Sequence, residues 1–191
     1  MKCKACSEEY PKPDMIDGKA YFVCLNCGDL QEVANYQART QGQIIEMVKD
    51  AFCGVELGNG IGLLQAQAID NREPDEVQTK WRKEDEKFHW ESISHELLES
   101  CHSSLSFFDA EGMKFHLPAF IVGSITGEVG DPLFHLTFDL GRHFYSKFAM
   151  LSECQKRAVS EYLTWCLTRD EYIYDHGAIQ KALELHWKRL S

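Results

Sequence analysis

The strongest constraint on the fold of this chain is a pair of Cys-x-x-Cys motifs near its N-terminus. The cysteines of these motifs are Cys3, Cys6, Cys24 and Cys27. Their spacing is typical of a four-thiolate zinc site, because each motif makes a tight turn whose two sulfurs converge on one ion. The sequence therefore predicts a rubredoxin-like zinc ribbon over residues 1–34, followed by a second domain over residues 35–191.

The zinc ion of such a ribbon is expected to be structural. Four cysteines fill every position of a tetrahedral ion, so no position is left for a substrate. A segment this short has no hydrophobic core of its own, and metal binding then supplies the folding energy. We expect one Zn²⁺ per chain as the only cofactor.

Acidic side chains outnumber basic ones and concentrate in the middle of the chain. The formal net charge is −10, and residues 70–111 hold twelve acidic and five basic side chains, a net charge of −7. Proteins that bind nucleic acid neutralise phosphates with basic patches, so this charge argues against DNA or RNA as a partner. An acidic surface attracts basic proteins instead.

The sequence shows no sign of a membrane or secretory segment. It has no run of 18 apolar residues, which is about the length needed to span a bilayer. Its N-terminal residues also lack the apolar stretch of a secretory signal. We therefore expect a cytoplasmic protein with no membrane partner.

The polar run over residues 70–87 predicts a solvated helix that begins at Pro74. Trp81 interrupts the polar pattern, and a large aromatic side chain either folds inward or is offered to a partner. We predict that a basic protein binds this tryptophan, the acids around it and the two acids of a later motif. The predicted partner-binding residues are Asp75, Glu76, Trp81, Glu84, Asp85, Glu86, Asp109 and Glu111.

Apolar residues at helical spacing predict several further helices. These cover residues 41–52, 63–69, 88–101 and 152–166, and a last helix follows Asp175. Ser152 and Gln155 have the spacing of a capping box, in which each side chain bonds the backbone N–H of the other residue. The second domain is therefore expected to be mainly helical.

The stretch Ser106–Gly123 is expected to organise the core. Residues 109–112 predict a turn, because Asp bonds its own backbone and Gly accepts unusual backbone angles. Pro118 suits the first turn of a helix over residues 119–125. We therefore predict an α+β fold: the zinc ribbon, then a mostly α-helical domain with a short central β-hairpin.

Asp109 and Glu111 allow two interpretations. Paired carboxylates can converge on a metal, and with a histidine such as His116 they would form the site of a metal-dependent hydrolase. Alternatively, Asp109 caps its own turn and Glu111 faces solvent. Turn chemistry favours the second interpretation.

Much of the chain, about residues 44–190, resembles an uncharacterised family of bacterial domains of unknown function. The resemblance rests on residues 60–70, on residues 90–93 and above all on residues 106–120, which fit the family's D-A-E-G-x-x-F-x-L-P-A-F core. It implies a shared fold and a bacterial setting but no reaction. We associate small acidic bacterial domains of this kind with immunity proteins, which neutralise toxins.

These observations favour a cytoplasmic bacterial immunity protein that is not an enzyme. It would bind and neutralise a basic toxin, such as a nuclease, by covering the toxin's active site with acidic surface. Two alternatives stay open. One is the metal-dependent hydrolase using Asp109 and Glu111, and the other is a regulator that binds nucleic acid through its zinc ribbon.

Overall fold

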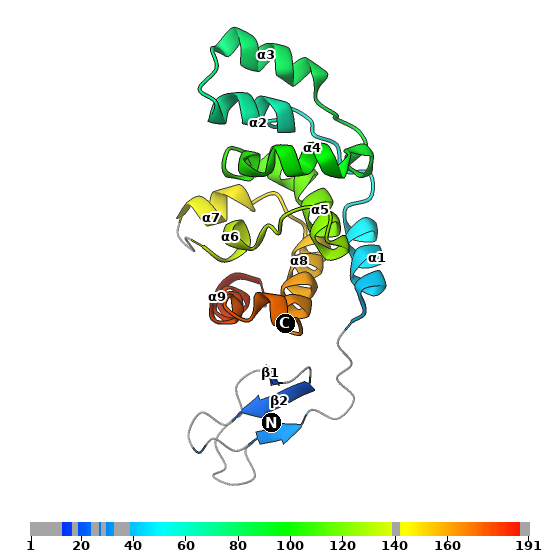
Figure 1. The fold of residues 1–191 in the computed structure, drawn as a ribbon, viewed down its shortest axis with the longest axis vertical. Helices are drawn as coiled ribbons and strands as arrows, with labels where there is room; N and C mark the ends of the chain where they lie inside the picture. The colour runs from blue at the N-terminus through cyan, green and yellow to red at the C-terminus, as the bar shows by residue number, and fades with distance from the viewer. Residues whose placement is uncertain are drawn as a thin grey trace.

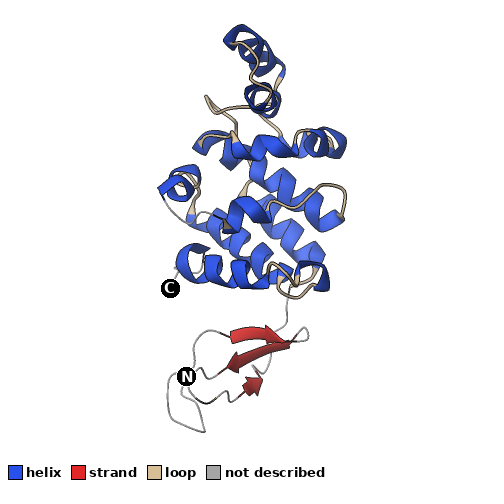
Figure 2. Ribbon diagram, turned by 60° about the vertical axis from the view of Figure 1, so that its left-hand side comes forward, coloured by secondary structure: helices blue, strands red, loops and turns tan. Residues whose placement is uncertain are grey.

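A computed structural model describes most of the chain. The described residues are 13–16, 19–23, 27, 30–32, 39–138 and 142–187, with side chains at 27, 39–138 and 144–187. The strands lie in the N-terminal part of these residues and the helices in the remainder (Figure 1). Figure 2 shows the same division by colour.

Three short strands form one antiparallel sheet. They are β1 (Pro13–Ile16), β2 (Lys19–Val23) and β3 (Leu30–Glu32), in the order β1-β2-β3. Pro13 pairs with Phe22, and Val23 pairs with Leu30. Proline lacks an N–H group, and its place at the first position of an edge strand leaves the ladder intact. Strand β2 ends directly before Cys24.

From residue 39 onward the described residues form helices and turns, and none of them forms a strand. The α-helices are α1 (Gln41–Ala51), α2 (Leu63–Asp70), α3 (Asp75–Glu84), α4 (His95–Ser100), α5 (Ala110–Thr126), α6 (Leu133–Thr137), α7 (Arg142–Lys147), α8 (Glu153–Cys166) and α9 (His176–Ala182). Short 3₁₀ helices are η1 (Trp90–Ser92), η2 (His102–Ser106) and η3 (Asp170–Tyr172), and η4 (Leu183–Trp187) is π-helical. The α+β class expected for this domain is therefore wrong.

The predicted central hairpin is a helix. Asp109 is the N-cap of α5, and its side chain accepts a hydrogen bond from the backbone N–H of Gly112. The predicted turn is thus the first turn of α5, and Pro118 lies inside the helix. An interior proline costs about 3 kcal/mol, because it removes one hydrogen bond and crowds the preceding turn. Twelve of the seventeen residues of α5 are buried, and each large apolar side chain contributes about 1.5–3 kcal/mol, so packing outweighs that cost.

Helix α5 is the centre of the hydrophobic core. It contacts α1, α4, α7 and η1, and it is apolar on all sides, as a central helix must be. Its buried Ser124 hydroxyl lies 2.8 Å from the hydroxyl of Tyr162 on α8. The indole N–H of Trp90 donates to the carbonyl of Phe52 at 3.1 Å. The polar groups of these large core residues are therefore paired.

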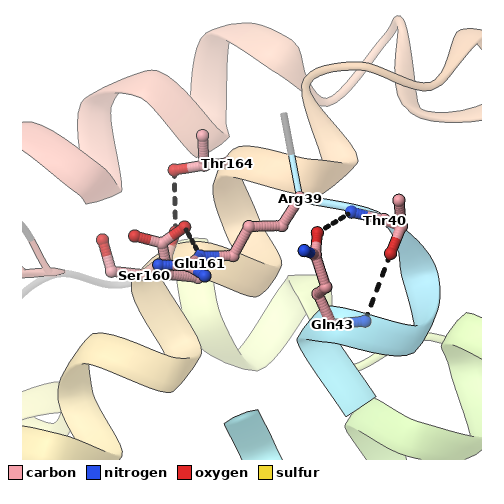
Figure 3. Close-up of polar contacts among 6 residues, drawn as sticks. All are labelled: Arg39, Thr40, Gln43, Ser160, Glu161 and Thr164. Carbon is pink, nitrogen blue, oxygen red and sulfur yellow. Dashed lines mark hydrogen bonds and ion pairs between the residues drawn. The ribbon is translucent and has the colours of Figure 1, made fainter. Parts of the chain in front are cut away.

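Helix α1 packs against α8 and begins at a capping box. The hydroxyl of Thr40 accepts the N–H of Gln43 at 3.3 Å, and the Gln43 side chain accepts the N–H of Thr40 at 2.9 Å (Figure 3). Arg39 donates to Glu161 on α8 at 3.0 Å. The box predicted at Ser152 and Gln155 is confirmed as the start of α8.

Helices α2 and α3 form a helical hairpin at one end of the domain, with α3 outermost (Figure 1). Arg72 in the connecting turn has a positive φ of 57°. None of the residues of α3 is buried. The single helix predicted over residues 88–101 is instead η1 followed by α4, because Ser94 caps α4 and ends the preceding segment.

No helix among the described residues combines the length and the apolar character needed to cross a bilayer.

Candidate functional site

Asp109 joins two segments that lie far apart in the sequence. One carboxylate oxygen, Oδ1, accepts the N–H of Ile61 at 3.0 Å and the N–H of Gly112 at 2.8 Å. The bond from Gly112 caps the start of α5. The bond from Ile61 attaches residues 58–62, which we call the glycine loop, to that start. Asp109 therefore positions the backbone of the glycine loop against the first turn of α5.

The glycine loop lies directly on the first turn of α5. A Cβ atom on Gly60 would be 2.5 Å from the backbone nitrogen of Gly112 and 2.6 Å from Cβ of Glu111. Side-chain carbons do not approach backbone so closely, so this position requires glycine. Glu111 is half-buried, and its carboxylate lies beside Gly58.

Asp85 extends this contact to α2 and α3. Its side chain is only 6% exposed, and it accepts the N–H groups of Leu64 at 2.7 Å and Gln65 at 3.3 Å. It thus caps the N-terminus of α2 from the end of α3. Burial raises the pKa of Asp85, and this effect outweighs the hydrogen bonds that lower it. Asp85 was predicted to bind a partner, but its carboxylate is turned into the protein.

Two neighbours of Asp85 also bond backbone. The guanidinium of Arg82 donates to the carbonyl of Gly58 in the glycine loop at 2.8 Å. Glu86 accepts the N–H groups of the three residues that follow it, at 2.8–3.0 Å. The bonds from Phe88 and His89 lower the pKa of Glu86.

His116 is buried within α5, next to the first turn. Its Nδ1 lies 2.8 Å from the carbonyl of Gly112, and its ring stacks on Phe108 with centroids 4.4 Å apart. Nε2 is buried and has no hydrogen-bond partner among the described residues. Burial lowers the pKa of His116 to about 4, so the imidazole is neutral at pH 7.

The proposed hydrolase residues are not arranged as a metal site. Asp109 is occupied by two backbone N–H groups, and His116 is packed among phenylalanines. Within the part of the chain that the structure describes, no group of three His, Cys, Asp or Glu side chains is placed to hold a metal ion. The geometry favours the capping interpretation of Asp109.

Four predicted partner-binding residues face solvent on α3. They are Asp75, Glu76, Trp81 and Glu84. The structure separates them from Asp85, Glu86 and Asp109, which bond backbone N–H groups. These predicted residues therefore divide into those on the exposed helix α3 and those whose carboxylates accept backbone N–H groups.

The predicted zinc ligands fall mainly outside the described residues. Cys27 lies in an exposed turn between β2 and β3. Cys3, Cys6 and Cys24 lie outside the described residues, and the zinc site remains a prediction.

Sequence reasoning missed a cavity of about 210 Å³ beside α6 and α7. Its lining residues are Ser106, Phe134, His135, Phe138, Phe144, Lys147 and Phe148. The available signal was two pairs of phenylalanines spaced four residues apart, Phe134 with Phe138 and Phe144 with Phe148. The structure places the first pair on α6 and its C-cap, and the second on α7 and directly after it.

Comparison with known proteins gives one match. A family model described as "Family of unknown function (DUF6714)" matches residues 40–191, which begin at the N-cap of α1. No curated protein and no solved structure matches the chain.

The close approach at Gly60 can be tested by adding one methyl group. We expect Gly60→Ala to lower the free energy of unfolding by about 2 kcal/mol or more, because the new carbon overlaps backbone that cannot move. The control is Gly42→Ala, where a Cβ meets nothing within 4 Å and the residue lies in α1. Urea denaturation should show the control unchanged or slightly more stable. Equal stability of the two variants would contradict the contact.

Burial of His116 predicts a loss of stability in acid. In the unfolded chain His116 binds a proton below about pH 6.5, but in the folded chain only below about pH 4. The contribution of His116 to the free energy of unfolding is therefore fully present above pH 6.5. It decreases by about 3 kcal/mol as the pH falls toward 4. Urea titrations at pH 7 and pH 4 should show a smaller loss in His116→Phe than in the native chain. Identical losses would show that His116 is not buried in a neutral form.

Proposed function

The chain belongs to the DUF6714 family, a family of unknown function, and we propose that it is a protein-binding module whose exposed α2–α3 hairpin docks a basic protein. The proposed role is that of a cytoplasmic bacterial immunity protein. Its partner would be a basic toxin, such as a nuclease, whose active site is covered on binding. The observation that carries this proposal is the exposure of α3.

Helix α3 lacks the buried apolar stripe of an ordinary surface helix. It is ten residues long and none of them is buried, although isolated helices of this length are marginal in water. Trp81 is 38% exposed, and Phe88, just beyond the helix, is 60% exposed. Trp81 and Glu84 are three residues apart and share one face. Exposed aromatic residues of this kind commonly anchor a protein partner.

The exposed acids of the hairpin supply charge complementarity. Glu73, Asp75 and Glu76 lie at its turn and at the start of α3, and all three are exposed. None of them forms an ion pair within the described residues. In contrast, Asp85, Glu86, Glu99 and Asp109 accept backbone N–H groups, so these four acids of residues 70–111 already have partners within the protein.

A basic toxin such as a nuclease has the surface that this hairpin would recognise. Nucleases bind phosphates through cationic groups, and carboxylates at the tip of the hairpin offer the same charge as phosphates. Such complementarity speeds association, while Trp81 and Phe88, once covered by the partner, would determine how slowly the complex dissociates. The basic residues Lys80 and Lys83 lie in the second half of α3 with Trp81, so the attraction for a basic partner would come from Asp75 and Glu76 in the first turn.

The proposal can be tested by reversing charge on the hairpin. The native chain would be coexpressed with the product of the neighbouring gene, and growth would report protection. We expect Asp75→Lys/Glu76→Lys to lower protection at least about tenfold, because two attractive charges become repulsive. The control is Asp170→Lys/Glu171→Lys, which reverses two adjacent exposed acids in the first turn of η3 and changes the net charge equally.

The control variant should protect as well as the native chain. A neighbouring product that is not toxic would refute the immunity role. Full protection by the hairpin variant would refute the α2–α3 hairpin as the docking surface. Thermal unfolding of both variants would establish that each is folded.

A further inference from the structure

The cavity beside α6 and α7 has a rigid aromatic floor. Phe144 and Phe148 are buried, and their ring centroids lie 5.5 Å and 5.1 Å from that of Trp187. The indole N–H of Trp187 donates to the carbonyl of Leu136 in α6 at 3.0 Å. The floor is therefore fixed by packing and by a buried hydrogen bond.

Two further phenylalanines form the rim of the cavity. Phe134 and Phe138 stack with centroids 4.7 Å apart, and they are 59% and 62% exposed. Exposure of two stacked phenylalanines leaves apolar surface in water, which is unfavourable unless something covers it. A cavity of about 150 Å³ lined by apolar residues suffices to bind benzene, so about 210 Å³ accommodates a ring with one substituent.

One end of the cavity is cationic. The ammonium of Lys147 donates to the carbonyls of Leu105 at 3.0 Å and Ser106 at 3.1 Å. An ammonium group has three N–H donors, so one is left for a ligand. Burial lowers the pKa of Lys147, which shows that the charge is held in partly dry surroundings. None of the described lining residues carries a carboxylate that would neutralise it.

His135 on α6 also lines the cavity. It is neutral at pH 7, because burial lowers its pKa to about 4. Neither ring nitrogen has a hydrogen-bond partner among the described residues. A neutral imidazole has one N–H donor, so its ring offers a second donor to a ligand oxygen. The cavity thus combines four phenylalanine rings with two polar donors and no described acid.

We propose that this cavity binds a small aromatic carboxylate. The ring lies among Phe134, Phe138, Phe144 and Phe148, and the carboxylate accepts hydrogen bonds from Lys147 and His135. Flat rings pack well against other rings, and a charge-assisted bond to a partly buried ammonium is stronger than a neutral one. A cationic ligand is repelled by Lys147, and an aromatic ring without an acceptor offers no partner to its third donor.

The experiment is an NMR titration of the full chain with benzoate and with benzamide, which has the same shape but no charge. We expect benzoate to shift signals of α6 and α7 with a dissociation constant of about 1 mM or below, within the range for a ligand this small. We expect benzamide to bind at least about tenfold more weakly, because its carbonyl oxygen accepts a hydrogen bond from the ammonium but carries no negative charge to pair with it.

Substitutions in the cavity show which protein side chains bind the ligand. Lys147→Met should weaken benzoate binding at least about tenfold and abolish the preference over benzamide. The control is Lys87→Met, because the ammonium of Lys87 also donates to a backbone carbonyl, that of Lys83 at 3.0 Å, but lies outside the cavity. If Lys147→Met does not fold, Phe134→Ala tests the exposed rim, and we expect it to weaken both ligands.

Three results would overturn the proposal. One is the absence of shifts with benzoate at about 10 mM, far above the affinity expected for this fragment. Another is equal binding of benzoate and benzamide. The third is benzoate binding that neither Lys147→Met nor Phe134→Ala changes.

Discussion

The hydrogen bonds to Oδ1 of Asp109 determine how the α2–α3 hairpin is attached to the core of the helical domain. This oxygen accepts hydrogen bonds from the N–H of Ile61 and the N–H of Gly112, so the glycine loop and the start of α5 share one acceptor. Helix α2 begins at the end of this loop, and Asp85 caps it from α3. The direction in which the α2–α3 hairpin leaves the core therefore depends on a contact in which Gly60 has no space for a side chain.

The acidic residues of this region therefore have two different roles. Asp85, Glu86 and Asp109 bind backbone N–H groups and hold the hairpin in place. Asp75 and Glu76 lie on the exposed helix that those bonds support. A binding surface that is already rigid loses less conformational freedom when its partner binds, and its affinity is therefore higher. The acids that accept backbone N–H groups thus contribute to the proposed function by positioning Asp75 and Glu76.

Local patterns in the sequence predicted much of the helical domain. The periodic apolar residues of α1, the capping box at Ser152 and the polar composition of α3 each depend on neighbours in the sequence, and the structure has these elements. The central hairpin was wrong because Pro118 and the Asp109 turn were interpreted locally. Burial of α5 on all sides allows an interior proline, and that burial comes from helices distant in the sequence.

Less of the candidate site could be predicted from the sequence. Asp85 and Glu86 stand in an acidic run that looks like exposed surface, and nothing local shows that Asp85 caps a helix about 20 residues earlier. The cavity at Lys147 is lined by residues of η2, α6 and α7, so its lining comes from segments that are separate in the sequence. Contacts of this kind depend on tertiary packing.

The most direct test of the Asp109 contact is native-state hydrogen exchange of the Ile61 amide. If Oδ1 of Asp109 accepts this amide, it should be protected, although in a loop, to the same degree as the amide of Gly112 in the first turn of α5. Both amides should lose protection in Asp109→Ala, while core amides of α8 such as Leu163 stay protected. Exchange of Ile61 in the native chain at the rate of an unprotected loop would contradict the account.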